Sequence, residues 1–171
     1  LRNPGCEKWT VHLRDTGLDT STGGRVKQLA EFIGPEPFML TYGDGVANIN
    51  ISRLLEFHRE SKRLVTVTAV HPVARFGAIT CDGDMVSRFA EKPQLSEGWI
   101  NGGFFVVEAD ATSSIKDHNA HWECEPLERL VHERQVSAYQ HEGFWQCMDT
   151  LRDVQLLNSL WEEGKAPWKV W

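Results

Sequence analysis

A carboxylate between two glycines stands at the end of an apolar run in the segment FMLTYGDGVANINI, residues 38–51. Asp44 follows the run Phe38–Tyr42, which is typical of a buried strand, and Gly43 and Gly45 flank it. Open α/β folds bind ligands along the carboxyl edge of their sheet, so Asp44 is a candidate ligand-binding residue. An Asp-Gly step is also an ordinary turn. The fragment alone leaves both interpretations open, with the turn slightly favoured.

Three further polar pairs stand where elements are expected to begin or end: Glu91-Lys92, Asn101-Gly102 and Met148-Asp149. Each pair taken alone is more often a surface pair, a bulge or a helix N-cap than a site. Together with Asp44 they supply two aspartates, a lysine and glycines. Carboxylates are hard oxygen ligands for Mg²⁺, a lysine places a point charge on a phosphate, and glycine lets a base or sugar touch backbone. This set is what phosphoryl or nucleotidyl transfer requires.

Hydrophobic periodicity predicts the elements that would position these residues. Alternating or β-branched runs predict strands, apolar residues at helical spacing predict helices, and Asp-Gly steps predict turns. Ser52 is expected to cap the second helix, and Pro126 to lie in the first turn of the third. The rhythm of strand, helix and strand implies a parallel sheet in an α/β fold. The expected strands are Trp9–Leu13, Phe38–Tyr42, Leu64–Val70, a hairpin around Asp82–Asp84, Gly102–Glu108, 137–141 and 145–149, and the expected helices are Gly24–Ile33, 52–62, 125–133 and 151–164.

Length and composition are those of one soluble domain, residues 1–171, without an inter-domain linker. The chain carries a net charge of -6 and has no Lys/Arg cluster, which argues against polymeric nucleic acid as a partner. No apolar run is long enough for a membrane span. The 4 cysteines lack C-x-x-C spacing, which favours reduced thiols in the cytoplasm. Because the first residue is not Met, the true start of the protein is left open.

Two further patterns resemble metal motifs more weakly. Asp82-Gly83-Asp84 imitates the D-x-D motif of glycosyltransferases, but Asp-Gly is also a favoured hairpin turn. His118, His121 and Cys124 have a spacing that could ligate zinc, but no fourth ligand stands in an obvious place. A turn and a solvated loop are therefore the favoured interpretations.

The order of short motifs along nearly the whole chain resembles one family of enzymes. These motifs are TGGRVKQLAEFI, YGDGVANI, RFGAI, FAEKP, INGGFFV, WECEPLERL, GFWQCMDTLRD and LWEEGKAPWKVW. Their combination closely resembles the glucose-1-phosphate cytidylyltransferases, which belong to the sugar-nucleotide pyrophosphorylases. The resemblance implies a Rossmann-like, GT-A-like nucleotidyltransferase fold, with a mixed α/β sheet flanked by helices. It also implies the conversion of CTP and α-D-glucose 1-phosphate to CDP-glucose and pyrophosphate, which feeds deoxysugar synthesis for bacterial surface polysaccharides.

The resemblance also implies roles for individual residues. Asp44 and Asp149 match the family's metal-binding aspartates, and the glycines beside Asp44 would clear room for Mg²⁺ and the nucleotide phosphates. With Lys92, these two aspartates would be the catalytic groups. The implied nucleotide-binding residues are Thr22, Gly23, Gly24, Arg25, Gly43 and Asp44, with Arg25 reading cytosine, and the implied sugar-phosphate residues are Gly77, Glu91, Lys92, Asn101 and Gly102, with Trp122 and Trp145 as walls of the sugar pocket.

The chain departs from the family at its start. Family members begin with a strand, a loop of the type G-G-x-G-T-R and a phosphate-binding lysine, and nothing in Leu1–Gly24 resembles these. About the first third of the family's chain is therefore expected to be missing, and activity of this chain alone to be impaired. The alternative is a non-catalytic remnant that acts as a binding or assembly module. Because an unpaired sheet edge is usually covered, we expect at least a homodimer, with Trp9–Leu13 and the tail APWKVW doing the covering.

Overall fold

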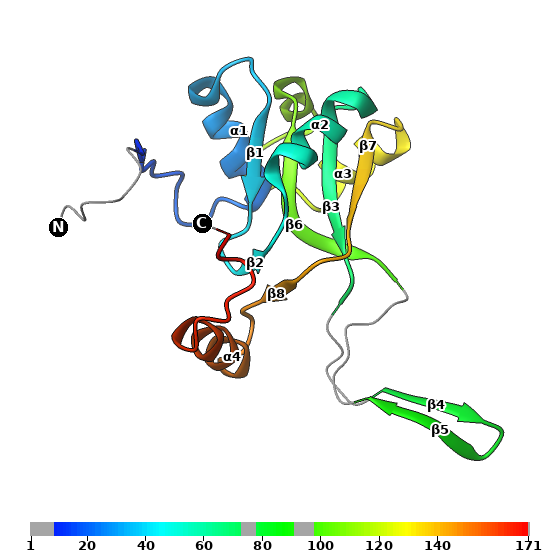
Figure 1. Ribbon diagram of the computed structural model, residues 1–171. Coiled ribbons are helices and arrows are strands. Elements are labelled where there is room, and N and C mark those ends of the chain that lie inside the picture. Colours follow the sequence, from blue (N-terminus) through cyan, green and yellow to red (C-terminus); the bar gives the residue numbers. More distant parts are fainter. Residues whose placement is uncertain (1–8, 73–77, 91–97, 171) are drawn as a thin grey trace.

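The computed structural model describes residues 9–72, 78–90 and 98–170 of the chain (Figure 1). Because the expected helices and strands rest on strong local periodicity, most of them are confirmed with small shifts at their ends. The elements are α1 (Thr22–Ile33), β1 (Phe38–Thr41), β2 (Gly45–Ala47), α2 (Ile51–Ser61), β3 (Val65–Val70), β4 (Ala78–Asp82), β5 (Met85–Ala90), β6 (Ile100–Val107), the 3-10 helix η1 (Ala109–Ser114), α3 (Glu125–His132), β7 (Val136–His141), β8 (Trp145–Cys147) and α4 (Leu151–Glu162).

The main sheet is mixed, which corrects the prediction of a parallel sheet. Its strand order is β1-β6-β3-β7. β6 lies antiparallel to both β1 and β3, whereas β3 and β7 are parallel. The βαβ rhythm correctly gives β1 and β3 the same direction, but it does not reveal that β6 inserts between them. Antiparallel neighbours need no crossover helix, so a strand that returns from the β4–β5 excursion can pair in this way.

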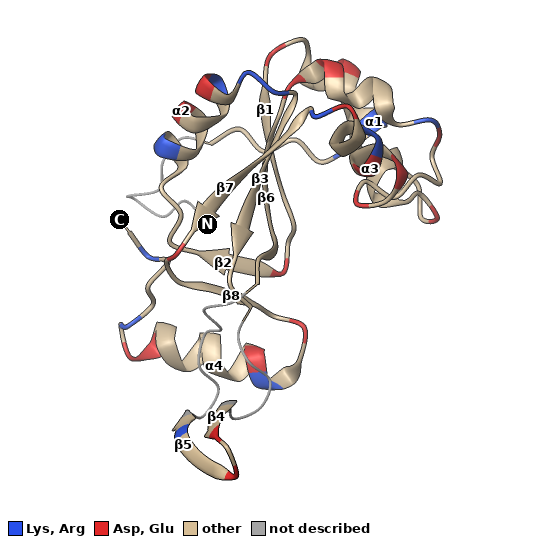
Figure 2. Ribbon diagram, turned by 90° about the vertical axis from the view of Figure 1, so that its right-hand side faces the viewer, with Lys and Arg blue, Asp and Glu red and all other residues tan. Residues whose placement is uncertain are grey.

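Alternating side chains of β6 divide the core between two faces of the sheet. Phe105 and Val107 pack with Trp122 and other residues from the side of α1, η1 and α3. Val106 points to the opposite face and packs with Leu54 of α2. Figure 2 shows α1 and α3 on one side of the sheet and α2 on the other. The period of two along a strand thus produces a three-layer arrangement.

A second, smaller sheet joins the end of β1 to the last helix. β2 pairs antiparallel with β8, and α4 follows β8 after a short connection. Thr150 caps α4 by accepting a hydrogen bond from the backbone of Asp153, whose side chain accepts one in return from the backbone N–H of Thr150. This reciprocal capping box fixes where α4 begins beside the small sheet.

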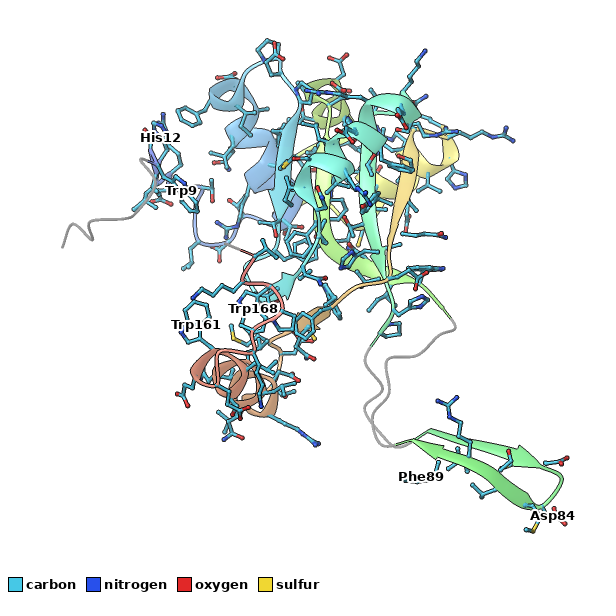
Figure 3. The ribbon with its side chains drawn as sticks, in the orientation of Figure 1. Trp9, His12, Asp84, Phe89, Trp161 and Trp168 are labelled. Carbon is cyan, nitrogen blue, oxygen red and sulfur yellow. The ribbon has the colours of Figure 1, made fainter. Side chains whose placement is uncertain are left out.

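The β4–β5 hairpin confirms the turn interpretation of the D-x-D pattern. Asp82 and Met85 form the last pair of the ladder, and Gly83 between them has a φ of 57°. Such a φ suits a hairpin turn with glycine. Asp84 and Phe89 are labelled on this hairpin in Figure 3.

The predicted strand Trp9–Leu13 is wrong. The structure assigns these residues to no strand (Figure 3 labels Trp9 and His12 of the segment). Trp9 is 79% exposed and Leu13 91% exposed. The segment runs beside the end of α1, where the His12 ring contacts the Phe32 ring with centroids 4.9 Å apart. Local alternation therefore gave a strand pattern without a neighbouring strand to satisfy its backbone.

The Trp-rich tail contacts its own chain. Trp168 stacks on Phe144 with ring centroids 5.6 Å apart, and Lys169 lies over the Trp161 ring (Figure 3). The predicted cap of α2 is also corrected, because the side chain of Asn50, not Ser52, accepts a hydrogen bond from the N–H of Arg53. None of the helices in the described ranges is long and apolar enough to cross a membrane.

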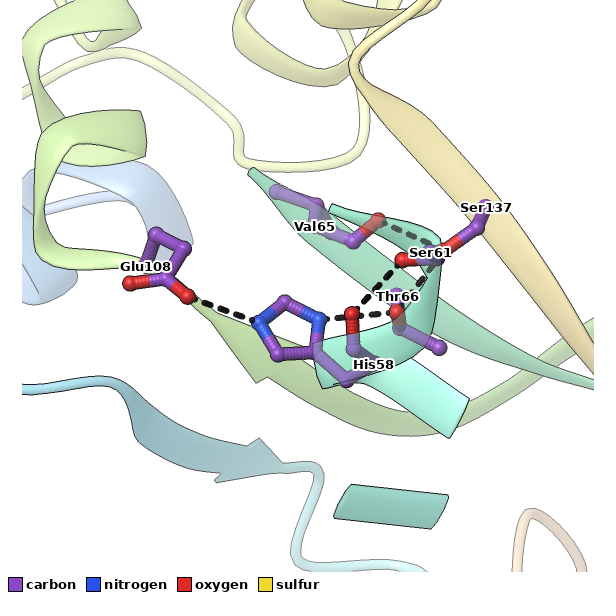
Figure 4. Close-up of polar contacts among 6 residues, drawn as sticks. All are labelled: His58, Ser61, Val65, Thr66, Glu108 and Ser137. Atoms are coloured by element: carbon purple, nitrogen blue, oxygen red, sulfur yellow. Dashed lines mark hydrogen bonds and ion pairs between the residues drawn. The ribbon is translucent and has the colours of Figure 1, made fainter. Parts of the chain in front are cut away.

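A polar cluster around the buried His58 lies at the C-terminal end of β6 (Figure 4). We call His58, Ser61, Thr66, Glu108 and Ser137 the His58 cluster. His58 is 1% exposed, with Nδ1 2.8 Å from Thr66 Oγ1 and Nε2 3.2 Å from Glu108 Oε1. Ser137 continues the chain of contacts to Thr66 and Ser61. The cluster joins α2 to β3, β7 and the end of β6.

Candidate functional site

A cavity of about 860 Å³ opens where β1 ends and β6 begins. Its walls come from three parts of the chain: the residues after β1, the first half of β6, and β8 with the start of α4. The carboxyl end of β1 is thus one border, as expected for ligand sites in open α/β sheets. The lining residues are Thr41, Tyr42, Asp44, Gly45, Pro72, Ile100–Phe104, Trp145–Cys147, Asp149, Thr150, Arg152, Asp153 and Leu156.

The small sheet brings Asp44 and Asp149 to this cavity. In the antiparallel ladder of β2 and β8, Gly45 pairs with Cys147. One step beyond that pair, the N–H of Met148 donates to the carbonyl of Asp44 at 2.7 Å. Asp44 precedes β2 and Asp149 follows β8, so both lie at the same end of the ladder. Both side chains are exposed and line the same cavity.

The charges around the cavity suit a divalent cation. Three carboxylates, those of Asp44, Asp149 and Asp153, line it together with one guanidinium, that of Arg152. Asp153 is engaged in the cap of α4, which leaves two carboxylates for a metal. The described part of the chain has no group of three or more His, Cys, Asp or Glu residues that could hold a metal alone. One or two carboxylates, completed by phosphate and water, is the donor set that Mg²⁺ takes in nucleotide enzymes.

A chain of hydrogen bonds runs along the wall at the carboxyl end of β1. The Tyr42 hydroxyl donates to Glu123 Oε1 at 2.7 Å and lies 3.0 Å from Asn101 Nδ2, which donates to it. Thr22 Oγ1 donates to the other carboxylate oxygen of Glu123 at 2.8 Å. We call Thr22, Tyr42, Asn101 and Glu123 the Tyr42 cluster. It connects the first residue of α1, the end of β1 and the start of β6.

Two groups at the cavity have raised pKa values. Burial, followed by the hydrogen bond to Glu123 and the charge of that carboxylate, raises the pKa of Tyr42 well above its usual range. Burial, followed by the charge of Asp149, raises the pKa of the Cys147 thiol. Both groups therefore stay protonated at neutral pH, and the cavity holds neither a tyrosinate base nor a thiolate nucleophile there.

The start of β6 is shaped by two glycines. A Cβ on Gly102 would lie 2.7 Å from Val70 Cγ1, and one on Gly103 would lie 2.6 Å from the Tyr42 ring. Gly103 also has a φ of 78°, which side chains rarely allow. The indole N–H of Trp145 donates to the Gly102 carbonyl at 2.9 Å. Asn101 and Gly102 thus line the cavity with Trp145. The sugar-phosphate role that the resemblance implies for them stays a prediction.

Trp122 does not form a wall of this cavity, which corrects its predicted place. It is 0% exposed and packs in the core against Phe105, with ring centroids 6.2 Å apart. The resemblance implies a pocket wall for Trp122, but in this structure its apolar surface covers the sheet.

The paired glycines of TGGR have a packing role in this structure. A Cβ on Gly23 would lie 2.7 Å from the carbonyl oxygen of Ala120, and one on Gly24 would overlap the backbone of His118. The N–H of Gly24 also donates to Ala120 at 3.2 Å. These contacts let the start of α1 lie directly on the segment before Trp122. Whether the same residues bind a nucleotide stays a prediction.

The other residues predicted to bind substrate either lie away from the cavity lining or fall outside the described residues. Arg25 donates to Thr16 Oγ1 at 2.5 Å and to the Leu18 carbonyl at 3.2 Å, away from the cavity lining. Gly43 is exposed, with open space where a Cβ would stand. Gly77, Glu91 and Lys92 lie outside the described residues.

Sequence reasoning missed Glu123. It is one of several carboxylates in WECEPLERL, and no local pattern separates it from its neighbours. The one available signal is its place directly after Trp122, because a core aromatic holds the next residue close to the packed elements.

Comparison with known proteins extends the geometric findings. Residues 8–166 match the family model described as nucleotidyl transferase. The chain is 46% identical over 166 residues to the glucose-1-phosphate cytidylyltransferase of Salmonella typhi, covering 96% of this chain and 65% of the relative. It is 28% identical over 135 residues to the mannose-1-phosphate guanyltransferase of Saccharomyces cerevisiae, covering 72% of this chain and 37% of that protein.

Solved structures show the same fold. A UDP-glucose pyrophosphorylase complexed with UDP-glucose matches with a TM-score of 0.61 and 13% identity, covering 86% of this chain and 64% of that one. HddC from Yersinia pseudotuberculosis matches with a TM-score of 0.58 and 17% identity, covering 81% of this chain and 61% of that one. These likenesses confirm the expected α/β fold class with a mixed, nucleotidyltransferase-type sheet flanked by helices.

Proposed function

The chain belongs to the nucleotidyl transferase family, and we propose that its cavity serves a glucose-1-phosphate cytidylyltransferase reaction. In this reaction a phosphate oxygen of glucose 1-phosphate attacks the α-phosphorus of CTP. A new P–O bond forms, the bond between the α-phosphorus and the bridging oxygen breaks, and pyrophosphate leaves. The products are CDP-glucose and pyrophosphate, so atoms and charge balance without a further reactant.

One observation carries the proposal: Asp44 and Asp149 share a cavity with Asn101 and Trp145. The carboxylates would hold Mg²⁺, and the lining at Asn101 and Trp145 would receive the sugar phosphate. Mg²⁺ would supply positive charge to phosphate oxygens that otherwise face a mainly acidic wall. The sequence identity to a glucose-1-phosphate cytidylyltransferase supports the choice of substrates.

The residues of this chain would act by binding and orienting, because phosphoryl transfer depends mostly on positioning and charge stabilisation. Asn101 would donate to an oxygen of the sugar phosphate. Trp145 would hold the Gly102 carbonyl in place through its indole N–H. Arg25 would read the cytosine carbonyl with guanidinium hydrogens that its contacts to Thr16 and Leu18 leave over. Lys92 would contact phosphate. We also propose that the chain works as a homo-oligomer.

Binding calorimetry tests the proposal. Titrations of glucose 1-phosphate, CTP and ATP into the protein, each with and without Mg²⁺, should show binding of CTP over ATP and a requirement for Mg²⁺. Asp44→Asn, which keeps the shape and removes one charge, should weaken Mg²⁺-dependent CTP binding about tenfold or more. Asp110→Asn, a change in the exposed first turn of η1, is the matched control and should bind like the parent.

Equal affinity for CTP and ATP would remove the cytidylyl part of the proposal. Failure of both CTP and glucose 1-phosphate to bind in the presence of Mg²⁺ would remove the whole of it. That second result would favour a non-catalytic binding or assembly module.

A further inference from the structure

Glu123 does not line the cavity itself, but it contacts Tyr42, which does. Its side chain is half-buried in the turn before α3. One carboxylate oxygen accepts from Thr22 at 2.8 Å and the other accepts from Tyr42 at 2.7 Å. Each oxygen therefore has a hydroxyl donor, one from the start of α1 and one from the residue after β1.

The carboxylate sets the direction of every hydrogen bond that leads away from it. Both carboxylate oxygens accept, and a carboxylate carries no hydrogen to donate. The single hydroxyl hydrogen of Tyr42 must point to Glu123. The Tyr42 oxygen can therefore only accept from its other partner, Asn101. On the other branch, the hydroxyl hydrogen of Thr22 is used in the same way, and Thr22 Oγ1 accepts from the N–H of Trp122 at 2.9 Å.

Asn101 is held in one orientation by two contacts. Its Nδ2 donates to the Tyr42 hydroxyl at 3.0 Å, and its Oδ1 accepts the N–H of Gly103 at 2.9 Å. Both contacts would become unfavourable if the amide turned over. A side-chain amide has two N–H hydrogens, and within the described residues only one of them has a partner, the Tyr42 hydroxyl. Because Asn101 is exposed and lines the cavity, the second hydrogen is left for a ligand.

We propose that Glu123 is a positioning residue that fixes Asn101 as a hydrogen-bond donor toward the cavity. It acts through Tyr42 and touches no ligand. The ligand chemistry that fits such a donor is an acceptor oxygen, of a phosphate or a sugar hydroxyl. The identity of that ligand as glucose 1-phosphate rests on the proposed function, whereas the orientation of the amide rests only on the hydrogen bonds described.

The variant Glu123→Gln changes the direction of the hydrogen bonds at this position while it keeps the shape of the side chain. Glutamine has nearly the same volume but carries an NH₂ group, which can donate to Tyr42. The Tyr42 hydroxyl could then donate to Asn101, and the amide could present its oxygen instead of its nitrogen. An amide oxygen facing a phosphate oxygen repels it. We therefore expect Glu123→Gln to weaken glucose 1-phosphate about tenfold, a typical loss for a hydrogen bond to a charged group. CTP affinity should change less.

Glu125→Gln is the matched control. Glu125 lies two residues away and contacts Lys116 and Arg129 at the surface. It should leave the affinity for glucose 1-phosphate unchanged. The double variant with Tyr42→Phe provides a second check, because Glu123→Gln should have no further effect on affinity once the Tyr42 hydroxyl is absent.

One readout does not depend on ligand. The side-chain ¹⁵N-amide signals of Asn101 should move in Glu123→Gln and stay in Glu125→Gln. Unchanged Asn101 signals, or an effect of Glu123→Gln that persists in the Tyr42→Phe background, would overturn the proposal. If the parent protein binds no glucose 1-phosphate, the proposed function fails, while the Asn101 signals still decide the role of Glu123.

Discussion

The His58 cluster and the Tyr42 cluster are built from similar polar groups, but only the Tyr42 cluster reaches the cavity. The His58 cluster and the Tyr42 cluster each join a helix to strands of the main sheet through a carboxylate, a ring and a hydroxyl. The His58 cluster lies at the last residues of β6 and its imidazole is 1% exposed. The Tyr42 cluster lies at the first residues of β6 and reaches the cavity at Asn101. One network is completed by the protein, whereas the other leaves a donor for a ligand.

This difference separates stability from binding. In the His58 cluster, both ring nitrogens have partners within the protein, Thr66 at Nδ1 and Glu108 at Nε2. In the Tyr42 cluster, Tyr42 and Glu123 have all their hydrogen-bond partners within the protein. Asn101, the last group of the cluster, keeps one N–H that faces the cavity. Changes in the first cluster should therefore act on folding, and changes in the second should act on ligand affinity as well.

The largest effect is expected from His58→Ala. It removes a buried ring, leaves a cavity, and takes a hydrogen-bond partner from Thr66. We expect the free energy of unfolding to fall by about 3 kcal/mol, with affinity for glucose 1-phosphate unchanged. Chemical denaturation and calorimetry on the same variant measure both quantities. A loss of affinity at unchanged stability would break the comparison.

Gly103→Ala should act on both properties. The added methyl group would lie 2.6 Å from the Tyr42 ring at a backbone φ of 78°. We expect a loss of about 2 kcal/mol in the free energy of unfolding, together with weaker glucose 1-phosphate binding because Tyr42 must move. Gly164→Ala is the control, since Gly164 also has a positive φ, 67°, but has open space around it. Equal losses in the two variants would show that the Tyr42 contact is unimportant.

Tyr42→Phe should reduce stability by about 1 kcal/mol and weaken glucose 1-phosphate, because Asn101 loses its acceptor and Glu123 loses a donor. Tyr139→Phe changes the other tyrosine, whose ring packs on Phe57, and should leave binding unchanged. A Tyr42→Phe variant that binds like the parent would show that the Tyr42 cluster, like the His58 cluster, has only a structural role.

The sequence predicts those parts of the fold that local pattern determines. The helices and the core strands of the main sheet follow from periodicity, and Asp44 and Asp149 follow from the ends of apolar runs. The order of strands in the main sheet does not follow from local pattern, because β6 pairs with β1 and β3, which are distant from it in sequence. Trp9–Leu13 shows the opposite error, since its alternation is local but none of the described strands pairs with it.

Residue type and place indicated Asn101, whereas Trp122 and Trp145 were implied only by the resemblance. Asn101 and Trp145 line the cavity, but Trp122 lies in the core. Glu123 acts through three-dimensional contacts to Thr22 and Tyr42, which are distant in sequence. Its role appears only once α1, β1 and β6 are placed together.

The smallest effect concerns pH. The pKa of Tyr42 is raised in the folded protein, so its contribution to stability is fully present below the ordinary tyrosine pKa near 10 and is lost as the pH rises through the raised value. The stability difference between the parent and Tyr42→Phe should therefore stay constant within about 0.3 kcal/mol from pH 7 to 9. Above pH 10 it should shrink. Urea denaturation of both proteins checks this, and a difference that changes between pH 7 and 9 would contradict the assigned environment of Tyr42.

The most direct test of the account is an NMR titration of the tryptophan indole N–H signals with glucose 1-phosphate in the presence of Mg²⁺. Trp145 lines the cavity and donates to Gly102, whereas Trp122 is sealed in the core. The account predicts that the Trp145 indole signal moves with ligand concentration while that of Trp122 stays in place. A Trp122 signal that moves while Trp145 does not, or no change in either at saturating ligand, would contradict the assignment of this cavity as the binding site.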